Sequence, residues 1–204
     1  MDLVTAEPAT TRRSMISTVG AAGIAAAIGA LAIARPAAAA PFAPTAADSK
    51  RLLAMMQLEL TAQELYMASI DAGLDGDAGA LAIVLADNHG AYAQAIAGSA
   101  GLSATSRISV VYDQFEAAFA TSDHVAWATA ANELEQTFVA THTESIPEFE
   151  AIEPINLVAS ILVVEARASV ILADVATLPT DEIVVNATEA KPLELATEEA
   201  EEGE

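Results

Sequence analysis

Three glutamates and one histidine lie on faces of predicted helices that are otherwise apolar: Glu59, His89, Glu135 and Glu165. Their neighbours at helical spacing are alanine, aliphatic, methionine and aromatic residues, which are typical of a core. Burying an unpaired carboxylate costs several kcal/mol unless the group is protonated, paired or bound to a metal. Three carboxylates and an imidazole in one core therefore predict a cation site, and these donors suit iron, manganese or zinc.

Two further glutamates provide the contrast, because they share helical faces with polar residues. Glu64 lies on the same face as Gln57 and Thr61, and Glu133 lies on the same face as Thr137. We expect both to face water. The alternative for the four inward residues is that each reaches water near a helix end or hydrogen-bonds to a neighbouring histidine or tyrosine.

Glycine and proline divide the chain into helices. No proline occurs between Pro44 and Pro147, and no glycine occurs between Gly101 and Gly203. The remaining glycines and prolines fall in clusters that are typical of connections. Together with Ser122-Asp123 as a helix N-cap pair, they predict four helices at about residues 46–72, 77–97, 122–145 and 154–177.

The segment 101–121 is too long for a tight turn and has apolar residues at helical spacing (Ile108, Val111, Tyr112, Phe115 and Phe119). About 12 helical and 8 extended residues cover about 44 Å, whereas a helix of about 25 residues spans roughly 37 Å. The segment can therefore return along the molecule and leave the second and third helices parallel. This pattern predicts an all-α fold, a four-helix bundle with a long crossover between helices two and three.

Four motifs contain the inward residues: Glu59 with Tyr66, Glu135 with His142, the string at residues 164–168 and the string at residues 86–89. They resemble the ligand motifs of the ferritin-like, rubrerythrin-type di-iron family. Glu59 is followed seven residues later by Tyr66, as in that family, and Glu135 is followed at the same distance by His142, where the family has tyrosine. The string Val164-Glu165-Ala166-Arg167-Ala168 matches the family's fourth helix except that its histidine is replaced by Ala168. The string Ala86-Asp87-Asn88-His89 keeps the histidine of the second helix and lacks the glutamate. The resemblance covers about residues 46–178.

The resemblance implies a ferritin-like bundle over residues 41–179 with four of six family ligands retained: Glu59, His89, Glu135 and Glu165. Either His142 substitutes as a ligand, or the site holds one metal ion or none. Asp87 is a poor substitute for the missing glutamate, because one position rotates it about 100° around the helix. The implied function is metal binding, with iron or another divalent metal, and oxidoreductase-type or iron-handling activity. The alternative is a structural or stress-associated bundle whose site has decayed.

The first 40 residues resemble a twin-arginine export signal. Arg12 and Arg13 precede an apolar run at residues 16–33 and an alanine stretch at residues 37–40. We therefore expect an exported protein, periplasmic or extracellular. The alternative is an uncleaved segment that anchors the chain in the membrane. Residues 180–204 contain nine acids and one lysine, which predicts an acidic, disordered tail.

Charge and composition exclude several classes of function. The chain has 8 Lys and Arg against 29 Asp and Glu, a formal net charge of -21. Nucleic acid and anionic membrane surfaces are therefore not expected as partners, because phosphate binding needs a basic patch. Cysteine is absent, which rules out disulfides, thiolate catalysis and iron–sulfur sites. A metal ion and a second copy of the chain remain as candidate partners.

Overall fold

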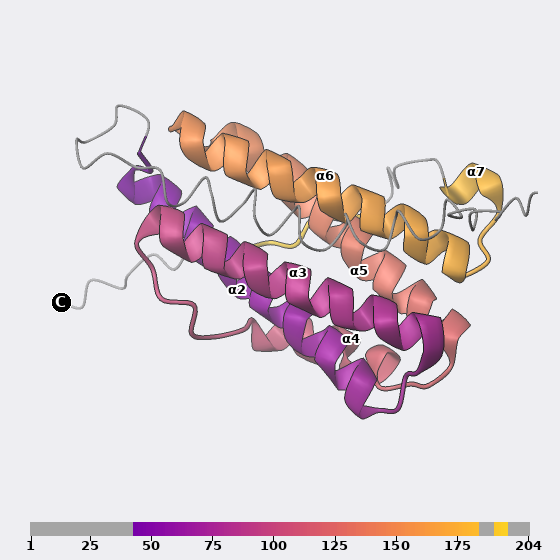
Figure 1. The fold of residues 1–204 in the computed structure, drawn as a ribbon. Helices are drawn as coiled ribbons and strands as arrows, with labels where there is room; N and C mark the ends of the chain where they lie inside the picture. The colour runs from indigo at the N-terminus through magenta and orange to yellow at the C-terminus, as the bar shows by residue number, and fades with distance from the viewer. Residues whose placement is uncertain (1–42, 184–189, 196–204) are drawn as a thin grey trace, which may run out of the picture. The chain divides into compact units, whose positions relative to one another are not determined.

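The computed structural model describes residues 43–183 and 190–195, and every regular element within them is a helix. The all-α prediction is therefore confirmed for this part of the chain. The predicted export signal at residues 1–40 lies outside the described residues. The elements, drawn in Figure 1, are α2 (Ala46–Asp71), α3 (Gly76–Ala100), α4 (Ser109–Phe119), α5 (His124–Ser145), a 3-10 turn η1 (Ile146–Glu148), α6 (Ile152–Val175) and α7 (Thr180–Ile183).

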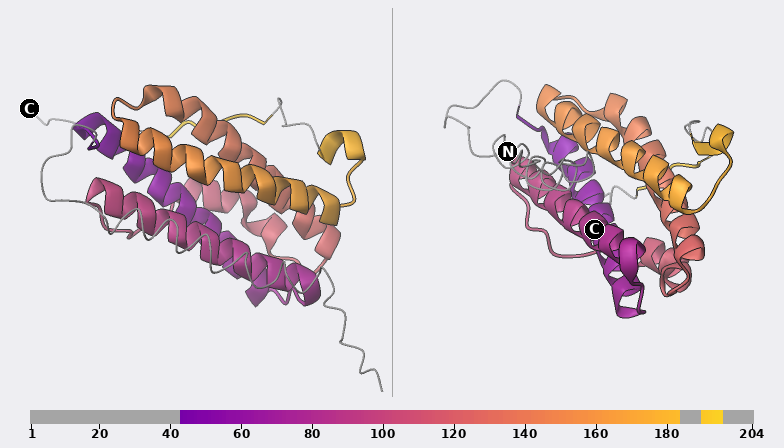
Figure 2. Two further views of the ribbon diagram at one scale, coloured as in Figure 1. Left: turned by 45° about the horizontal axis from the view of Figure 1, so that its top comes forward. Right: turned by 45° about the vertical axis from the view of Figure 1, so that its right-hand side comes forward.

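The four long helices form two antiparallel pairs. Helix α2 packs against α3, and α5 packs against α6, each pair being joined by a short connection (Figure 2). The pairs meet through α3 with α6 and through α2 with α5. Leu58, Leu65, Trp127, Leu134 and Phe138 are fully buried between these elements, so the inner faces of all four helices enclose one core.

The start of α2 is fixed by a capping box. The Thr45 hydroxyl accepts a hydrogen bond from the Asp48 N–H at 3.1 Å, and the Asp48 carboxylate accepts one from the Thr45 N–H at 3.0 Å. The same carboxylate also accepts hydrogen bonds from the N–H groups of Glu150 and Ala151, at 2.8 and 3.1 Å. Asp48 therefore joins the first turn of α2 to the residues that precede α6.

The helix boundaries follow the predicted signals. Helix α3 continues past the predicted end at residue 97 to Ala100, and its C-cap is Gly101, whose φ of 68° is in the left-handed region that glycine tolerates best. Asp123 caps α5 by accepting hydrogen bonds from the N–H groups of Val125 and Ala126. Pro154 lies in the first turn of α6, where a missing N–H is tolerated.

Helix α4 lies in the segment that joins α3 to α5, and it packs against α2 and α5. It buries four of the apolar residues that predicted it: Val111, Tyr112, Phe115 and Phe119. The segment before it is tied to α2, because the Ile108 N–H donates to the Thr61 hydroxyl at 2.9 Å.

The same connection changes the environment of one predicted polar face. Glu64 is exposed as predicted and forms an ion pair with Arg107. Gln57 donates to the Ser106 hydroxyl at 2.9 Å, and Thr61 is fully buried. Glu64 is thus exposed, whereas Thr61 on the same face of α2 is buried because residues 106–108 cover it.

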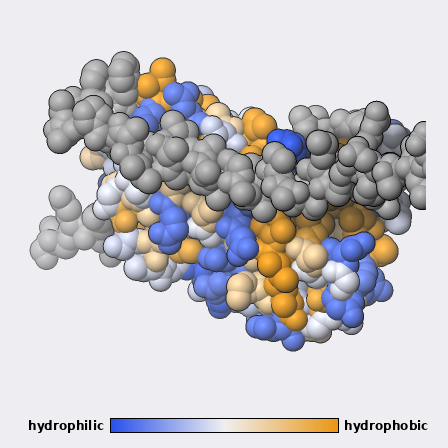
Figure 3. All heavy atoms as spheres, in the orientation of Figure 1, coloured by the Kyte–Doolittle hydropathy of each residue, from blue (hydrophilic) through white to orange (hydrophobic). Residues whose placement is uncertain are grey.

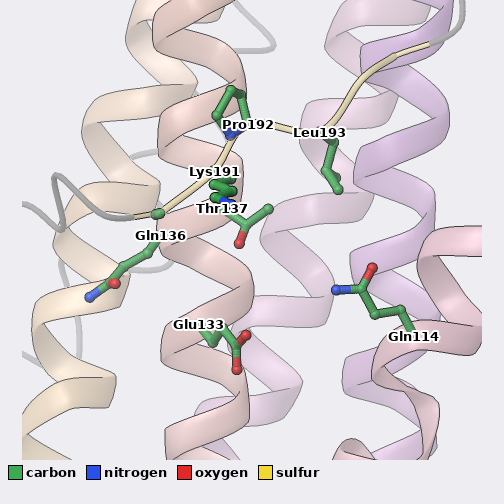
Figure 4. Close-up of a pocket in the computed structure, with 8 residues that line it drawn as sticks. Gln114, Glu133, Gln136, Thr137, Lys191, Pro192 and Leu193 are labelled. Atoms are coloured by element: carbon green, nitrogen blue, oxygen red, sulfur yellow. The ribbon is translucent and has the colours of Figure 1, made fainter.

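Two stretches of the acidic C-terminal region have defined positions. Residues 180–183 form α7, and residues 190–195 contact α5, where the Leu193 N–H donates to the Thr141 hydroxyl at 3.0 Å. Leu193 and Leu195 pack against the core. Figure 4 shows Pro192 and Leu193 beside the helix that carries Thr137. Disorder remains a prediction for the other residues of the tail.

Helix α6 is the one helix among the described residues that is long and apolar enough to cross a membrane, with a mean hydropathy of 1.9. A core helix of a soluble protein meets the same criterion. Here α6 packs against α5 and buries Val158, Ile161 and Leu172, while Val163 and Ile171 are exposed. In the face of the molecule seen in Figure 3, hydrophobic and hydrophilic side chains are interspersed.

Candidate metal centre

The five candidate ligands predicted from the sequence all lie in the interior. Glu59 is on α2, His89 on α3, Glu135 and His142 on α5, and Glu165 on α6. Each is at most 1% exposed. The structure also brings them into contact with one another, so that four helices contribute to a single buried cluster of three carboxylates and two imidazoles.

One side of the cluster is connected by hydrogen bonds through His89. Its Nδ1 lies 2.7 Å from Glu59 Oε2, and its Nε2 lies 3.0 Å from Glu135 Oε1. The Tyr66 hydroxyl donates to the same Glu135 oxygen at 2.5 Å. A histidine donates through both nitrogens only when both carry a proton, so the two contacts together correspond to an imidazolium held between two carboxylates.

His142 has a different environment. Its Nδ1 donates to the Phe138 carbonyl at 2.8 Å, one helical turn earlier. Its Nε2 lies 3.1 Å from Glu59 Oε1, and its Nδ1 lies 3.4 Å from Glu165 Oε2. These two contacts do not have hydrogen-bond geometry, since neither Nε2 nor the two carboxylate oxygens have a hydrogen-bond partner among the described residues.

Several donor atoms of the cluster are buried without a hydrogen-bond partner among the described residues: Glu59 Oε1, Glu135 Oε2, both oxygens of Glu165, and His142 Nε2. Native proteins leave few buried polar atoms unpaired, because each costs about 1–3 kcal/mol and a charged one costs more. Five such atoms in one cluster are therefore a specific feature of this core.

Glu59, His89 and Glu165 form a buried group that could bind a metal ion. Each offers one ligand atom, and these three atoms lie within 4.8 Å of one another. Glu135 adjoins this group through His89, and His142 adjoins it through Glu59 and Glu165. Carboxylate oxygens and imidazole nitrogens are ligands for iron, manganese and zinc.

The cluster shifts the pKa values of its members in opposite directions. Burial raises the pKa of Glu165 to about 8, and the negative charges of Glu59 and Glu135 add to this effect. Burial also raises the pKa of Glu59, but the adjacent imidazoles of His142 and His89 outweigh this effect and hold the value at about 2. One carboxyl is thus kept neutral near pH 7 while another stays ionised.

The histidines respond to the same carboxylates. Burial lowers the pKa of His142, but Glu165 and Glu59 outweigh this effect and raise it to about 9. Burial likewise lowers the pKa of His89, and Glu135 and Glu59 raise it well above its ordinary value. Without a metal ion, protons therefore neutralise much of the negative charge of the cluster.

Aromatic side chains enclose the histidine between the two carboxylates. The Tyr66 ring stacks on His89 at 5.5 Å between centroids, and Tyr92 and Phe138 meet His89 edge-on at 5.8 and 5.7 Å. Trp127 is fully buried and meets Tyr66 edge-on. These rings exclude water and fix the orientation of the imidazole.

Sequence reasoning did not identify two features of the site. The first is the Phe138 carbonyl, which orients His142, and spacing indicates it only once His142 is known to face inward. The second is the Tyr92 hydroxyl, which is buried without a hydrogen-bond partner among the described residues. Its position three residues after His89 on the same face was the available signal.

The positions where the family pattern expects further ligands provide none. Ala86 and Ala168 are both buried, at 3% and 8% exposure, and alanine has no donor atom. Asp87 is exposed, which agrees with the prediction that it does not replace the missing glutamate. His124, the first residue of α5, is also exposed.

A separate pocket of about 430 Å³ lies between α4, α5 and residues 190–193. Figure 4 shows Gln114, Glu133, Gln136 and Lys191 around it, and the lining includes none of the five cluster residues. The pocket is polar and partly open, and it contributes nothing to the metal centre.

Comparison with known proteins finds no match for this chain. No family model, no curated protein and no solved structure matches the chain. The functional assignment therefore depends on the geometry of the cluster and on the resemblance of its ligand motifs.

Proposed function

We propose that this chain is an exported ferritin-like protein that binds iron or a similar divalent metal ion in its buried cluster. The observation that carries the proposal is Glu165, which is 1% exposed and has no hydrogen-bond partner for either oxygen among the described residues. It lies in one group with Glu59 and His89. A cation is the simplest partner for such a carboxylate.

The arrangement of the helices supports the ferritin-like part of the proposal. Two antiparallel pairs contribute inward ligands from all four long helices, and α4 occupies the connection between the second and third of them. Ferritin-like proteins place their metal ligands on the facing sides of four helices and use one long connection. The position of α4 is what a crossover of that kind requires.

The proposed activity is oxidoreductase-type chemistry or the handling of iron. A bound iron ion would supply one-electron redox chemistry, and the residues around it would control the access of water and protons. Tyr66 and His89 hold Glu135, and His89 also holds Glu59. These bonds keep two carboxylates oriented, which metal sites require of their supporting residues.

A second candidate function is a structural or stress-associated bundle with a decayed site. One observation favours it: the cluster can balance charge with protons alone, since His89 contacts both Glu59 and Glu135 and the pKa of Glu165 is raised to about 8. In that case the polar residues are remnants, and an apolar residue at position 165 would be tolerated.

Metal analysis of the purified full chain separates the two candidates. The protein is stripped with a chelator, loaded with Fe²⁺ without oxygen, or with Mn²⁺ or Zn²⁺, and dialysed before its metal content is measured. The proposal predicts stoichiometric metal with at least one of the three and its loss in Glu165→Leu. Glu133→Gln, a change of an exposed glutamate, is the control and keeps the metal. Less than about 0.1 ion per chain in every loading contradicts the proposal.

Export is tested separately. Replacement of Arg12 and Arg13 by lysine in the full chain should retain the protein inside the cell, because the adjacent arginines are the distinguishing part of the signal. Fractionation of cells that produce each version measures the result. Equal export of both versions contradicts a twin-arginine signal without affecting the metal proposal.

A further inference from the structure

We propose that the cluster holds one divalent cation per chain, not two, and that His142 Nε2 is the single imidazole ligand of that ion. This inference rests on the proposed metal-binding function and makes it more specific. It departs from the resemblance, which implies two irons and expects tyrosine at the position of His142.

His142 is oriented by the backbone of its own helix. Its Nδ1 donates to the Phe138 carbonyl at 2.8 Å, so a neutral ring has its lone pair on Nε2. Hydrogen bonding of one ring nitrogen to a carbonyl is the usual way in which proteins orient a ligating imidazole. His142 therefore presents Nε2 for coordination without losing any hydrogen bond.

The free nitrogen of His142, Nε2, faces Glu59. It lies 3.1 Å from Glu59 Oε1, and neither atom has a hydrogen-bond partner among the described residues. A divalent cation that displaces the proton of His142 can be coordinated by this nitrogen and this oxygen together. The two oxygens of Glu165 also have no hydrogen-bond partner among the described residues, and one of them lies 3.4 Å from Nδ1 of the same ring. Glu59, His142 and Glu165 thus offer donor atoms that no hydrogen bond uses.

His89 differs, because both of its nitrogens are occupied. They lie 2.7 and 3.0 Å from oxygens of Glu59 and Glu135. His89 can coordinate an ion only by giving up one of these contacts, although its position would allow it. We therefore assign His89 as a positioning residue that acts through the two carboxylates.

The supply of donor atoms fits one ion. Within the cluster, the atoms that no hydrogen bond from the described residues uses belong to Glu59, Glu135, Glu165 and His142. The described residues form one group whose ligand atoms lie within 4.8 Å of one another, that of Glu59, His89 and Glu165. Ala86 and Ala168 also supply no donors for a second ion.

The test is X-ray absorption spectroscopy of the Zn²⁺-loaded full chain, together with the ratio of zinc to protein. We expect one zinc per chain and the scattering of one coordinated imidazole. The imidazole signal should disappear in His142→Ala and remain in His89→Ala. The control is His124→Ala, which changes an exposed histidine of α5, the helix that also carries His142. Zinc affinity should fall about 100-fold in His142→Ala and about 10-fold in His89→Ala.

His142→Gln serves as a second variant if His142→Ala does not fold, since the amide keeps a polar group of similar size. Two zinc ions per chain, two imidazoles per ion, or loss of the imidazole signal in His89→Ala alone would overturn the inference and leave metal binding intact. Absence of zinc, iron and manganese from the wild-type chain would instead overturn the proposed function together with it.

Discussion

Two buried carboxylates of this protein have opposite environments. Asp48 and Glu165 are 0% and 1% exposed. Asp48 accepts hydrogen bonds from three backbone N–H groups, those of Thr45, Glu150 and Ala151. Glu165 accepts none from the described residues and faces a histidine and two other carboxylates. Both carboxylates are thus buried, but only Asp48 has hydrogen-bond donors around it among the described residues. This difference separates a structural carboxylate from a candidate metal ligand.

The pKa values follow the same division. Burial raises the pKa of Asp48, but its backbone hydrogen bonds outweigh this effect and hold the pKa below its ordinary value. Burial raises the pKa of Glu165 to about 8, because the attraction of His142 opposes burial only in part and no hydrogen bond from the described residues adds to it. Asp48 is therefore stable as an anion without a cation, whereas Glu165 needs a proton or a metal ion.

The largest expected effect is the loss of Asp48. Asp48→Ala leaves three N–H groups without their acceptor and removes the capping box of α2. We expect the free energy of unfolding to fall by about 3–5 kcal/mol, measured by urea denaturation. Asp75→Ala is the control, because Asp75 is at the N-cap of α3 without a capping hydrogen bond.

The loss should be equal with and without metal, because Asp48 lies outside the cluster. A change of less than about 1 kcal/mol would show that the hydrogen bonds of Asp48 contribute little to stability. Asp48 could then no longer be contrasted with Glu165 as a structural carboxylate.

The second prediction is the pH dependence of the metal-free protein. Glu165 and His142 have folded pKa values of about 8 and 9, above those of the unfolded chain. The folded state therefore binds protons that the unfolded state has released, and stability falls as pH rises from about 5 to about 9. Glu59, with a folded pKa of about 2, contributes stability that is lost as pH falls below about 4.

Unfolding midpoints measured from pH 3 to pH 9 check this profile. A bound divalent ion replaces protons, so saturating metal should abolish the loss above pH 7. A metal-free protein whose stability is constant from pH 5 to pH 9 would contradict the assigned protonation of Glu165 and His142.

The third prediction concerns Glu165 itself. Glu165→Leu replaces a buried carboxyl that has no hydrogen-bond partner among the described residues by an apolar group of similar size. The metal-free protein should therefore gain about 1–3 kcal/mol at pH 8. The stabilisation that metal gives to the wild type should disappear. Thermal unfolding with and without Zn²⁺ measures both effects, and a variant that retains metal-dependent stabilisation would contradict the role of Glu165.

How far the sequence alone leads can be judged from these residues. Periodicity placed Glu59, His89, Glu135, His142 and Glu165 inside, and the structure agrees, because each is the polar exception on an apolar face. Glycine, proline and cap residues placed the helix ends for the same kind of local reason.

Tertiary contacts explain what the sequence left open. Asp48 looks like an ordinary capping residue, and only the approach of residues 150–151 makes it a buried junction. No periodicity in the sequence signals which carboxylate will find backbone donors, because the donors of Asp48 come from residues about 100 positions away in the chain. The same holds for Thr61, which residues 106–108 cover.

The smallest expected effect is that of Tyr66, which sharpens the contrast within the cluster. Tyr66→Phe removes the hydrogen bond to Glu135 and should lower stability by about 1–2 kcal/mol. Tyr92→Phe is the matched control, since Tyr92 also contacts His89 but its hydroxyl has no hydrogen-bond partner among the described residues. Equal effects of the two changes on urea denaturation would contradict the hydrogen-bonded role of Tyr66.

The most direct measurement of the central claim is anomalous diffraction from crystals of the metal-loaded chain, recorded on both sides of the metal's absorption edge. The account predicts one anomalous peak per chain, beside Glu59 Oε1, His142 Nε2 and the Glu165 carboxylate. The absence of a peak between these side chains, in crystals soaked in a solution of the metal, would contradict the account.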